Sequence, residues 1–270
     1  MASPRPAIGR LRLRILAYHA IADLGDDPVI AEYAVPPRRF AAHLDALEGS
    51  GWNFVDLEAV LAALAGERPL PRRALLLTFD DAYVDLLEVA RPLLVERGIP
   101  AVAFAIAAEL GGTNGWDARR GAASLALLDG DGLRAVAADG IEVGSHGSSH
   151  AALPEVAAGQ LEEEIAGSAR RLEELGLPRP RSFSYPFGRW DPGIAAAVRE
   201  AGYELALTTA WGVVGRGSDR FALPRIEVHA SDTPLKLRLK LLAAGWPGLL
   251  RDVFLKLAGV RLDPSARPHR

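Results

Sequence analysis

Short apolar segments alternate with longer segments whose apolar positions recur at helical spacing along most of the chain. The expected strands are 13–18, 52–55, 74–79, 101–106, 141–144, 182–185, 205–208 and 225–228. The expected helices are 38–49, 57–64, 83–97, 133–138, 160–175 and 192–201. Such repeated β-α units are typical of a parallel sheet that is covered by helices.

The segment 74–79, ALLLTF, lacks the polar and apolar alternation of a half-exposed strand, which is typical of a parallel strand buried on both faces. We therefore expect an α/β fold, namely a distorted or incomplete (β/α) barrel of seven or eight parallel strands. A doubly wound open sheet is the alternative. No internal repeat or low-complexity linker divides the chain, so 1–232 is expected to form one domain.

The segment 233–270 has a different pattern, because basic residues alternate there with Leu, Trp and Phe and no strand is expected. The basic residues that stand out are Lys236, Arg238, Lys240, Arg251 and Lys256. Such an amphipathic extension either packs on the outside of the barrel or lies on a membrane surface.

Composition narrows the possible chemistry. Hydrophobic residues make up 49% of the 270, enough for a sizeable core, and the net charge of −3 argues against a general nucleic-acid-binding protein. Without cysteine, any metal must be held by histidine and carboxylate ligands. The first twenty residues lack the apolar centre of a signal peptide, and no run approaches about 18 apolar residues, so a cytoplasmic protein is expected.

Polar residues of catalytic type follow two of the expected strands, at the end where barrel enzymes build their sites. Asp80 and Asp81 follow 74–79, and buried adjacent carboxylates are costly unless they are paired or bound to a cation. Taken alone, this pair also fits a turn or a helix N-cap. His146 and His150 follow 141–144 in SHGSSH, where they could converge on one ion or simply lie at the surface.

Together, two imidazoles and one carboxylate would give three ligands and leave a position for water, as in catalytic zinc sites. The other aspartate would then be available as a general base. The usual pattern of non-haem iron oxygenases places a carboxylate two residues after the first histidine, where this chain has Ser148. An oxygenase is therefore disfavoured.

From about Ile15 to His229 the chain resembles the polysaccharide deacetylase family, also called NodB-homology or chitin-deacetylase-like hydrolases. The segments similar to its first, second, third and fifth motifs are TFDDAY at 78–83, SHGSSH at 145–150, FSYPFG at 183–188 and LPRIEVH at 223–229. The fourth motif, Asp-x-x-Asp-Trp, has no clear counterpart. The resemblance implies that 1–232 is a NodB-homology catalytic domain.

The resemblance also implies roles for individual residues. Asp80 would be the base that acts on a metal-bound water. Asp81, His146 and His150 would hold a divalent metal. Zinc is the expected metal, with cobalt or another divalent ion as alternatives. Three further residues would serve the substrate: Pro186 and Phe187 would line the groove, with the Phe187 N–H holding the oxyanion, and His229 would be the general acid.

Three positions depart from the family pattern, and one of them is Gly147, where the family usually has a serine or threonine. Ala82 replaces a glycine, and Ser184 stands where chitin deacetylases carry an arginine that orients the base. Without that positive charge, the pKa of Asp80 should be lowered less, unless Arg225 reaches Asp80 from a neighbouring strand. Outside the motifs, His19 could face the substrate or be a rim histidine, and Trp116 could stack on a sugar or be a buried anchor.

The activity implied is deacetylation of an N-acetylated or O-acetylated sugar in polysaccharide or glycolipid metabolism. The partners would be an acetylated sugar, an oligosaccharide or a lipid-linked glycan, with no nucleic acid and with peripheral membrane contact through 233–270 as an option. Hydrolysis of a non-sugar linear or cyclic amide is the alternative. A non-catalytic carbohydrate-binding protein is a further alternative, favoured by the altered third and missing fourth motifs.

Overall fold

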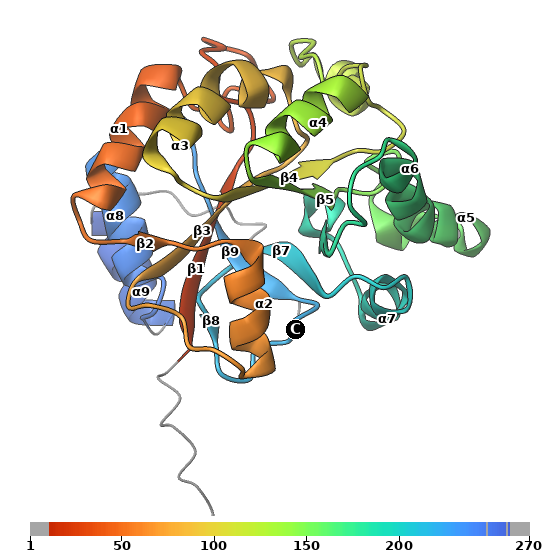
Figure 1. Cartoon of the computed structure of the whole chain (residues 1–270). Helices are drawn as coiled ribbons and strands as arrows, with labels where there is room; N and C mark the ends of the chain where they lie inside the picture. Colours follow the sequence, from red (N-terminus) through yellow and green to blue (C-terminus); the bar gives the residue numbers. More distant parts are fainter. Residues whose placement is uncertain (1–10, 247, 258, 260–270) are drawn as a thin grey trace, which may run out of the picture.

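Seven parallel strands close into a barrel in the computed structural model, which describes residues 11–246, 248–257 and 259 (Figure 1). The ring runs β3-β4-β5-β6-β7-β9-β1 and is closed by pairing of β1 with β3. The strands are β1 Arg12–Tyr18, β2 Asn53–Phe54, β3 Ala74–Phe79, β4 Ala101–Ala105, β5 Ile141–Ser145, β6 Ser182–Ser184, β7 Leu205–Trp211, β8 Val214–Gly215 and β9 Leu223–Glu227. The expected barrel is thus confirmed, and the open sheet is wrong.

Two short strands add to the sheet where β3 and β1 begin. β2 pairs with the start of β3 on the side where β4 pairs with its end, and β8 pairs antiparallel with the start of β1 beside β9. β5 and β6 share a single residue pair, Ser145 with Phe183, so the barrel is distorted there.

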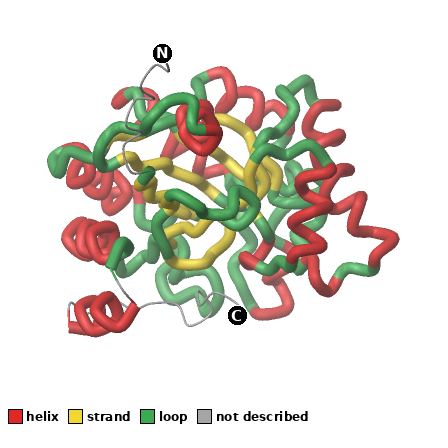
Figure 2. Tube along the Cα trace, turned by 90° about the horizontal axis from the view of Figure 1, so that it is seen from below, coloured by secondary structure: helices red, strands yellow, loops and turns green. Residues whose placement is uncertain are grey.

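Helices surround the ring, as the view from below makes clear (Figure 2). The α-helices are α1 Pro37–Glu48, α2 Leu57–Ala65, α3 Arg91–Arg97, α4 Gly130–Ala138, α5 Ala158–Glu162, α6 Ser168–Glu174, α7 Pro192–Glu200, α8 Pro234–Ala243 and α9 Gly248–Leu257. Two π-helical turns, η1 Leu86–Ala90 and η4 Glu163–Gly167, precede α3 and α6. Three 3-10 turns are η2 Gly115–Arg120, η3 Leu153–Glu155 and η5 Pro186–Gly188.

Alternation along the strands divides the core into an inner and an outer part. Leu13, Leu76, Phe104 and Leu207 come from four strands around the ring yet pack in one cluster, which is possible only through the barrel interior. α2 joins this cluster through Val60 and closes the barrel at the end where the strands begin. The alternate residues pack outward against helices, including α1, α3, α4 and α8.

The two C-terminal helices lie side by side at the outer edge of the molecule (Figures 1 and 2). α8 packs on α1 and buries Leu237, Lys240 and Leu241. The Lys240 ammonium pairs with the Asp232 carboxylate in the loop before α8 and donates to the Glu227 carbonyl at 3.1 Å. The segment 260–270 lies outside the described residues. No helix in the described part of the chain is long and apolar enough to cross a membrane.

Gly144 allows the strand that carries the histidine loop to approach its neighbour. A Cβ there would lie 2.5 Å from the Phe104 ring and 2.7 Å from the Ser182 hydroxyl. We expect Gly144→Ala to lower the free energy of unfolding by about 1–3 kcal/mol, because overpacking forces side chains or backbone to shift. Urea unfolding measures this change.

Gly159→Ala is the matched control, because this α5 glycine has open space around its Cα. It should be neutral or stabilising by up to about 1 kcal/mol, the difference in helix propensity. Equal effects of the two substitutions would contradict the packing argument.

Candidate active site

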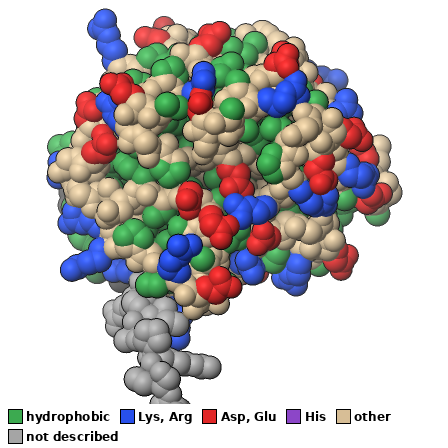
Figure 3. Space-filling view, viewed as in Figure 1, with side chains coloured by type: hydrophobic (Ala, Val, Ile, Leu, Met, Phe, Trp, Pro, Cys, Tyr) green, Lys and Arg blue, Asp and Glu red, His purple; other side chains and the backbone are tan. Residues whose placement is uncertain are grey.

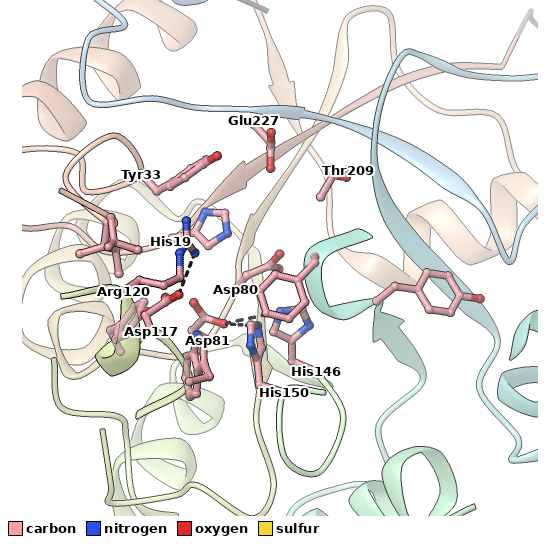
Figure 4. A pocket seen from close by; sticks show the side chains of 16 residues that line it. His19, Tyr33, Asp80, Asp81, Asp117, Arg120, His146, His150, Thr209 and Glu227 are labelled. Carbon is pink, nitrogen blue, oxygen red and sulfur yellow. Dashed lines mark hydrogen bonds and ion pairs between the residues drawn. The ribbon is translucent and has the colours of Figure 1, made fainter. Parts of the chain in front are cut away.

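A pocket of about 190 Å³ opens where β1, β3, β5 and β9 end, which is the catalytic face of a barrel (Figure 4). Seven of the residues expected at the site line it: Asp80, Asp81, His146, His150, Phe187, His19 and Trp116. Pro186 and His229 are buried and are not among the described lining residues. The strand ends thus bring together most, but not all, of the expected set.

Asp81, His146 and His150 form a cluster with the geometry of a metal site. One potential ligand atom from each residue lies within 4.8 Å of the others. The Asp81 Oδ1 atom is 3.5 Å from His146 Nε2 and 3.4 Å from His150 Nε2. All three side chains are buried, so the cluster is not a chance grouping of surface residues.

Backbone contacts orient the first histidine. His146 Nδ1 lies 2.7 Å from the Ser184 carbonyl oxygen, which can only accept, so Nδ1 carries the proton and Nε2 is left for the cluster. A ring N–H held by a carbonyl is the usual partner of a metal-binding histidine. The strand β6 therefore fixes both the tautomer and the direction of His146.

The electrostatics of the cluster favour a cation. Burial, followed by the charge of Asp80, raises the pKa of Asp81 to about 8. Burial, followed by the neighbouring His146, lowers the pKa of His150 well below its ordinary value. Asp81 Oδ1 is buried without a hydrogen-bond partner among the described residues. A divalent ion would satisfy this oxygen and offset the cost of two adjacent buried carboxylates.

Asp80 is held by a two-pronged ion pair with Arg225. The guanidinium donates from Nη1 to Oδ1 at 2.7 Å and from Nη2 to Oδ2 at 2.6 Å. Both residues are almost fully buried. Burial alone would raise the pKa of Asp80, but the charge of Arg225, then that of His146, brings the pKa well below its ordinary range. The expectation that the pKa of Asp80 is lowered less is therefore wrong, because Arg225 reaches Asp80 from β9.

Ser184, at the position where the family carries its arginine, completes this arrangement. Its hydroxyl lies 2.9 Å from Arg225 Nη2 and 3.3 Å from Asp80 Oδ2. Arg225 also donates from Nε to the Thr208 carbonyl at 3.0 Å. The small side chain of Ser184 thus leaves room for the long side chain of Arg225, which comes from β9.

The site loops contain strained backbone. Among the described residues, five non-glycine residues have positive φ, and four of them are Asp81 (68°), Ala82 (51°), His150 (59°) and Phe187 (57°). Left-handed conformations of such residues cost free energy and gather at functional sites. Ala82, where the family has glycine, adopts the conformation that glycine would adopt without strain.

Aromatic rings flank the second histidine. The centroid of the His150 ring lies 4.3 Å from that of Trp116 and 4.5 Å from that of Phe187. Trp116 is half-buried in η2, and Phe187 is 49% exposed. The pocket therefore offers apolar faces next to the cluster of Asp81, His146 and His150, and such faces can stack on a sugar ring.

His19 and His229 lie on the β1 and β9 side of the pocket. The ring of Tyr33, which lines the pocket, is 5.2 Å from that of His19 and 5.6 Å from that of His229. Burial lowers the pKa of His19 to about 4, so its ring is neutral at pH 7. His229 Nδ1 lies 3.5 Å from the Glu32 carboxylate. His229 is thus one side chain removed from the pocket.

The sequence reading missed several residues of the pocket wall, notably Tyr33, Thr209 and Glu227. In Figure 4, Thr209 and Glu227 lie toward one side of the view and the Asp81 cluster toward the other. Glu227 could have been found, because it shares a strand face with Arg225. Tyr33 lies outside the helices and strands, so no periodicity pointed to it.

Comparisons with known proteins find similarity over most of this chain. A family profile described as polysaccharide deacetylase matches residues 67–206, which include the Asp80–Asp81 pair and the histidine loop. The protein YxkH of Bacillus subtilis (strain 168), whose name assigns it provisionally to the polysaccharide deacetylases, is 27% identical over 217 residues. The match covers 80% of this chain and 71% of YxkH.

Solved structures share the fold. The Streptococcus pyogenes deacetylase PplD in complex with acetate has a TM-score of 0.74 and 23% identity, covering 88% of this chain and 100% of that one. IcaB from Ammonifex degensii has a TM-score of 0.69 and 27% identity, covering 80% of this chain and 91% of that one.

Proposed function

This chain belongs to the polysaccharide deacetylase family, and we propose that it hydrolyses the acetyl group of an N-acetylated sugar, with O-acetylated sugars as the variant of the same chemistry. The observation that carries this proposal is the buried Asp81, His146 and His150 cluster beside the Arg225-held Asp80. The acetylated unit would belong to a free sugar, an oligosaccharide or a lipid-linked glycan. The residues that carry the chemistry lie within 1–232, the proposed catalytic domain.

Asp81, His146 and His150 would hold a divalent metal, and their mixture of imidazole and carboxylate donors suits zinc, with cobalt as an alternative. When bound, such an ion lowers the pKa of water and polarises a carbonyl oxygen. The buried Asp81 oxygen without a hydrogen-bond partner supports this assignment.

Asp80 would act as the general base. The two hydrogen bonds from Arg225 keep the Asp80 carboxylate ionised and fix its orientation. Asp80 can therefore accept a proton without first losing one. The same ion pair weakens the hold of Asp80 on that proton, which favours passing it on. Ser184 steadies one carboxylate oxygen.

The remaining roles concern the substrate. Trp116 and Phe187 would stack on the sugar, next to His150. The Phe187 N–H would hold the developing oxyanion, and the buried Pro186 would set the turn that presents it. We assign proton donation to the leaving amine to His229 on the family pattern, with His19 on the pocket wall as a substrate contact.

The test measures acetate release from a panel of acetylated sugars by metal-stripped protein, with and without added zinc or cobalt. Asp80→Asn should lower turnover by about 10²–10⁴-fold, the usual contribution of a general base, while the bound metal is retained. Asp131→Asn, on the exposed face of α4, is the matched control and should leave turnover unchanged.

Other outcomes would point elsewhere. Metal-dependent hydrolysis of linear or cyclic amides, with no reaction on sugars, would favour the non-sugar amidase. Sugar binding without hydrolysis of any acyl group would favour a carbohydrate-binding protein. Full activity in Asp80→Asn would contradict the role of Asp80.

A further inference from the structure

A second, larger cavity lies at the other end of the barrel, where β1 and β3 begin. Its volume is about 580 Å³, and four arginines line it: Arg12, Arg14, Arg72 and Arg73. The remaining described lining residues are Gly51, Asn53, Leu70 and Pro71, so this described lining includes no carboxylate. We call it the arginine cavity.

Arg14 makes this a built feature rather than a group of loose surface chains. It is 9% exposed, its Nε donates to the Leu241 carbonyl at 2.8 Å, and its guanidinium lies 4.9 Å from the centre of the Trp52 ring. Burial, followed by the charges of Arg12 and Arg73, lowers the pKa of Arg14 to about 10. The positive charges of Arg12, Arg14 and Arg73 therefore lie close enough to repel one another.

Several arginines elsewhere in the described chain have acidic partners. Arg97, Arg170 and Arg181 each pair with carboxylates, whereas no ion pair between described residues includes any arginine of the cavity. Acidic and basic side chains are interspersed over the face in Figure 3. The arginine cavity is thus a local excess of positive charge on a chain whose net charge is −3.

Exposed apolar side chains follow, along the chain, a glycine that contacts Arg12 of the cavity. Gly245, in the turn from α8 to α9, lies so close to Arg12 that a Cβ would meet its guanidinium. Trp246 follows at 45% exposure, and the first turns of α9 present Leu249 at 80% and Leu250 at 62%. Val253, 52% exposed, continues the same helical stripe. We call these four side chains the α9 stripe.

We propose that the arginine cavity and the α9 stripe form a docking surface for an anionic phospholipid bilayer. The cavity would receive lipid phosphate groups, which arginine binds through paired N–H donors. The stripe would insert its apolar side chains at the boundary between headgroups and acyl chains, as interfacial helices do. The combination favours a lipid over a soluble phosphate compound, because a soluble ligand gains nothing from Leu249 and Leu250.

Docking in this way sets the direction of the active site. The arginine cavity lies where β1 and β3 begin, and Asp80 and Asp81 follow the end of β3. The catalytic pocket therefore faces away from the bilayer. A glycan long enough to extend from the membrane could reach it, whereas a sugar held at the headgroup level could not.

The test is flotation of the full chain with phosphatidylglycerol and phosphatidylcholine vesicles and with pure phosphatidylcholine vesicles. We expect binding to the anionic vesicles alone, weakened by added salt. The double substitution Arg12→Ala and Arg72→Ala should lower the partition coefficient about thirtyfold, since each basic residue near an anionic surface contributes on the order of fivefold. Leu249→Ser with Leu250→Ser should weaken binding without removing its salt dependence.

The matched control is Arg170→Ala with Arg179→Ala, which removes the same charge from two carboxylate-paired arginines elsewhere. It should bind as the unaltered chain does. Equal loss in both arginine pairs, or no binding to anionic vesicles, would overturn the proposal. Titration with inorganic phosphate is the second arm, and phosphate binding without vesicle binding would assign the cavity to a soluble anion instead. Thermal melts establish that the variants are folded, and acetate release, which depends on the other end of the barrel, should be unchanged.

Discussion

His146→Ala is expected to abolish stoichiometric binding of zinc and, with it, acetate release. The variant keeps only two of the three clustered ligands, and the imidazole that is lost is the one oriented by the Ser184 carbonyl. Removing an outer partner of a metal ligand typically costs about 10–100-fold in affinity or activity, so loss of a ligand should cost more. Metal content after gel filtration and competition with a chelator measure the change.

His19→Gln is the control for this experiment. His19 lines the same pocket but is not part of the cluster. The variant should retain the metal, whatever happens to its affinity for the sugar. Unaltered zinc affinity in His146→Ala would contradict the assignment of the cluster as the metal centre, whereas metal loss in both variants would show a general disturbance of the pocket.

Arg225→Met is expected to destabilise the metal-free protein by about 3–5 kcal/mol at pH 7. The substitution leaves the Asp80 carboxylate buried without its counterion, and a broken buried ion pair carries a penalty of this size. Urea unfolding in the presence of a chelator separates this effect from any change in metal affinity.

The pH dependence of the same variant has a definite sign. In the unaltered chain the pKa of Asp80 is lowered, so its contribution to stability is present above about pH 4 and is lost as the pH falls through the folded-state pKa. In Arg225→Met the main group that opposes the effect of burial is lost, so that pKa rises. The deficit should therefore be largest at neutral pH and shrink toward pH 4. Adding Asp80→Asn to the variant should recover much of the loss, and failure to do so would contradict the pairwise account.

The barrel was predictable because its strands are short, apolar and separated by helices. The expected segment 74–79 is β3 itself, and the parallel arrangement follows from the alternation of elements. Closure depends on β1 pairing with both β3 and β9, which no local pattern encodes. The expected helix at Tyr83 begins one residue later, at Val84, because Tyr83 instead forms a bridge with Leu127 from a distant loop.

The site was predictable where chemistry is concentrated in short segments. The adjacent aspartates and the spaced histidines indicated a shared ion before any partner was visible, and the resemblance assigned Asp80 and Asp81 to different tasks. Glu227 was missed because the segment 223–229 resembles a motif whose functional residue is its last one, His229. The wall residue Tyr33 was missed because it is positioned by tertiary packing in a segment that lacks regular structure.

The left-handed residues at the site have a consequence for transfer of its motifs to other proteins. Asp81, His150 and Phe187 would each relax in an unsupported peptide, since such conformations cost about 1–3 kcal/mol apiece. A peptide with the sequence SHGSSH therefore should not bind zinc with the affinity of the whole chain. A graft onto another scaffold would have to bring β3, β5 and β6 in their present register, because the ligand geometry is a property of the closed ring.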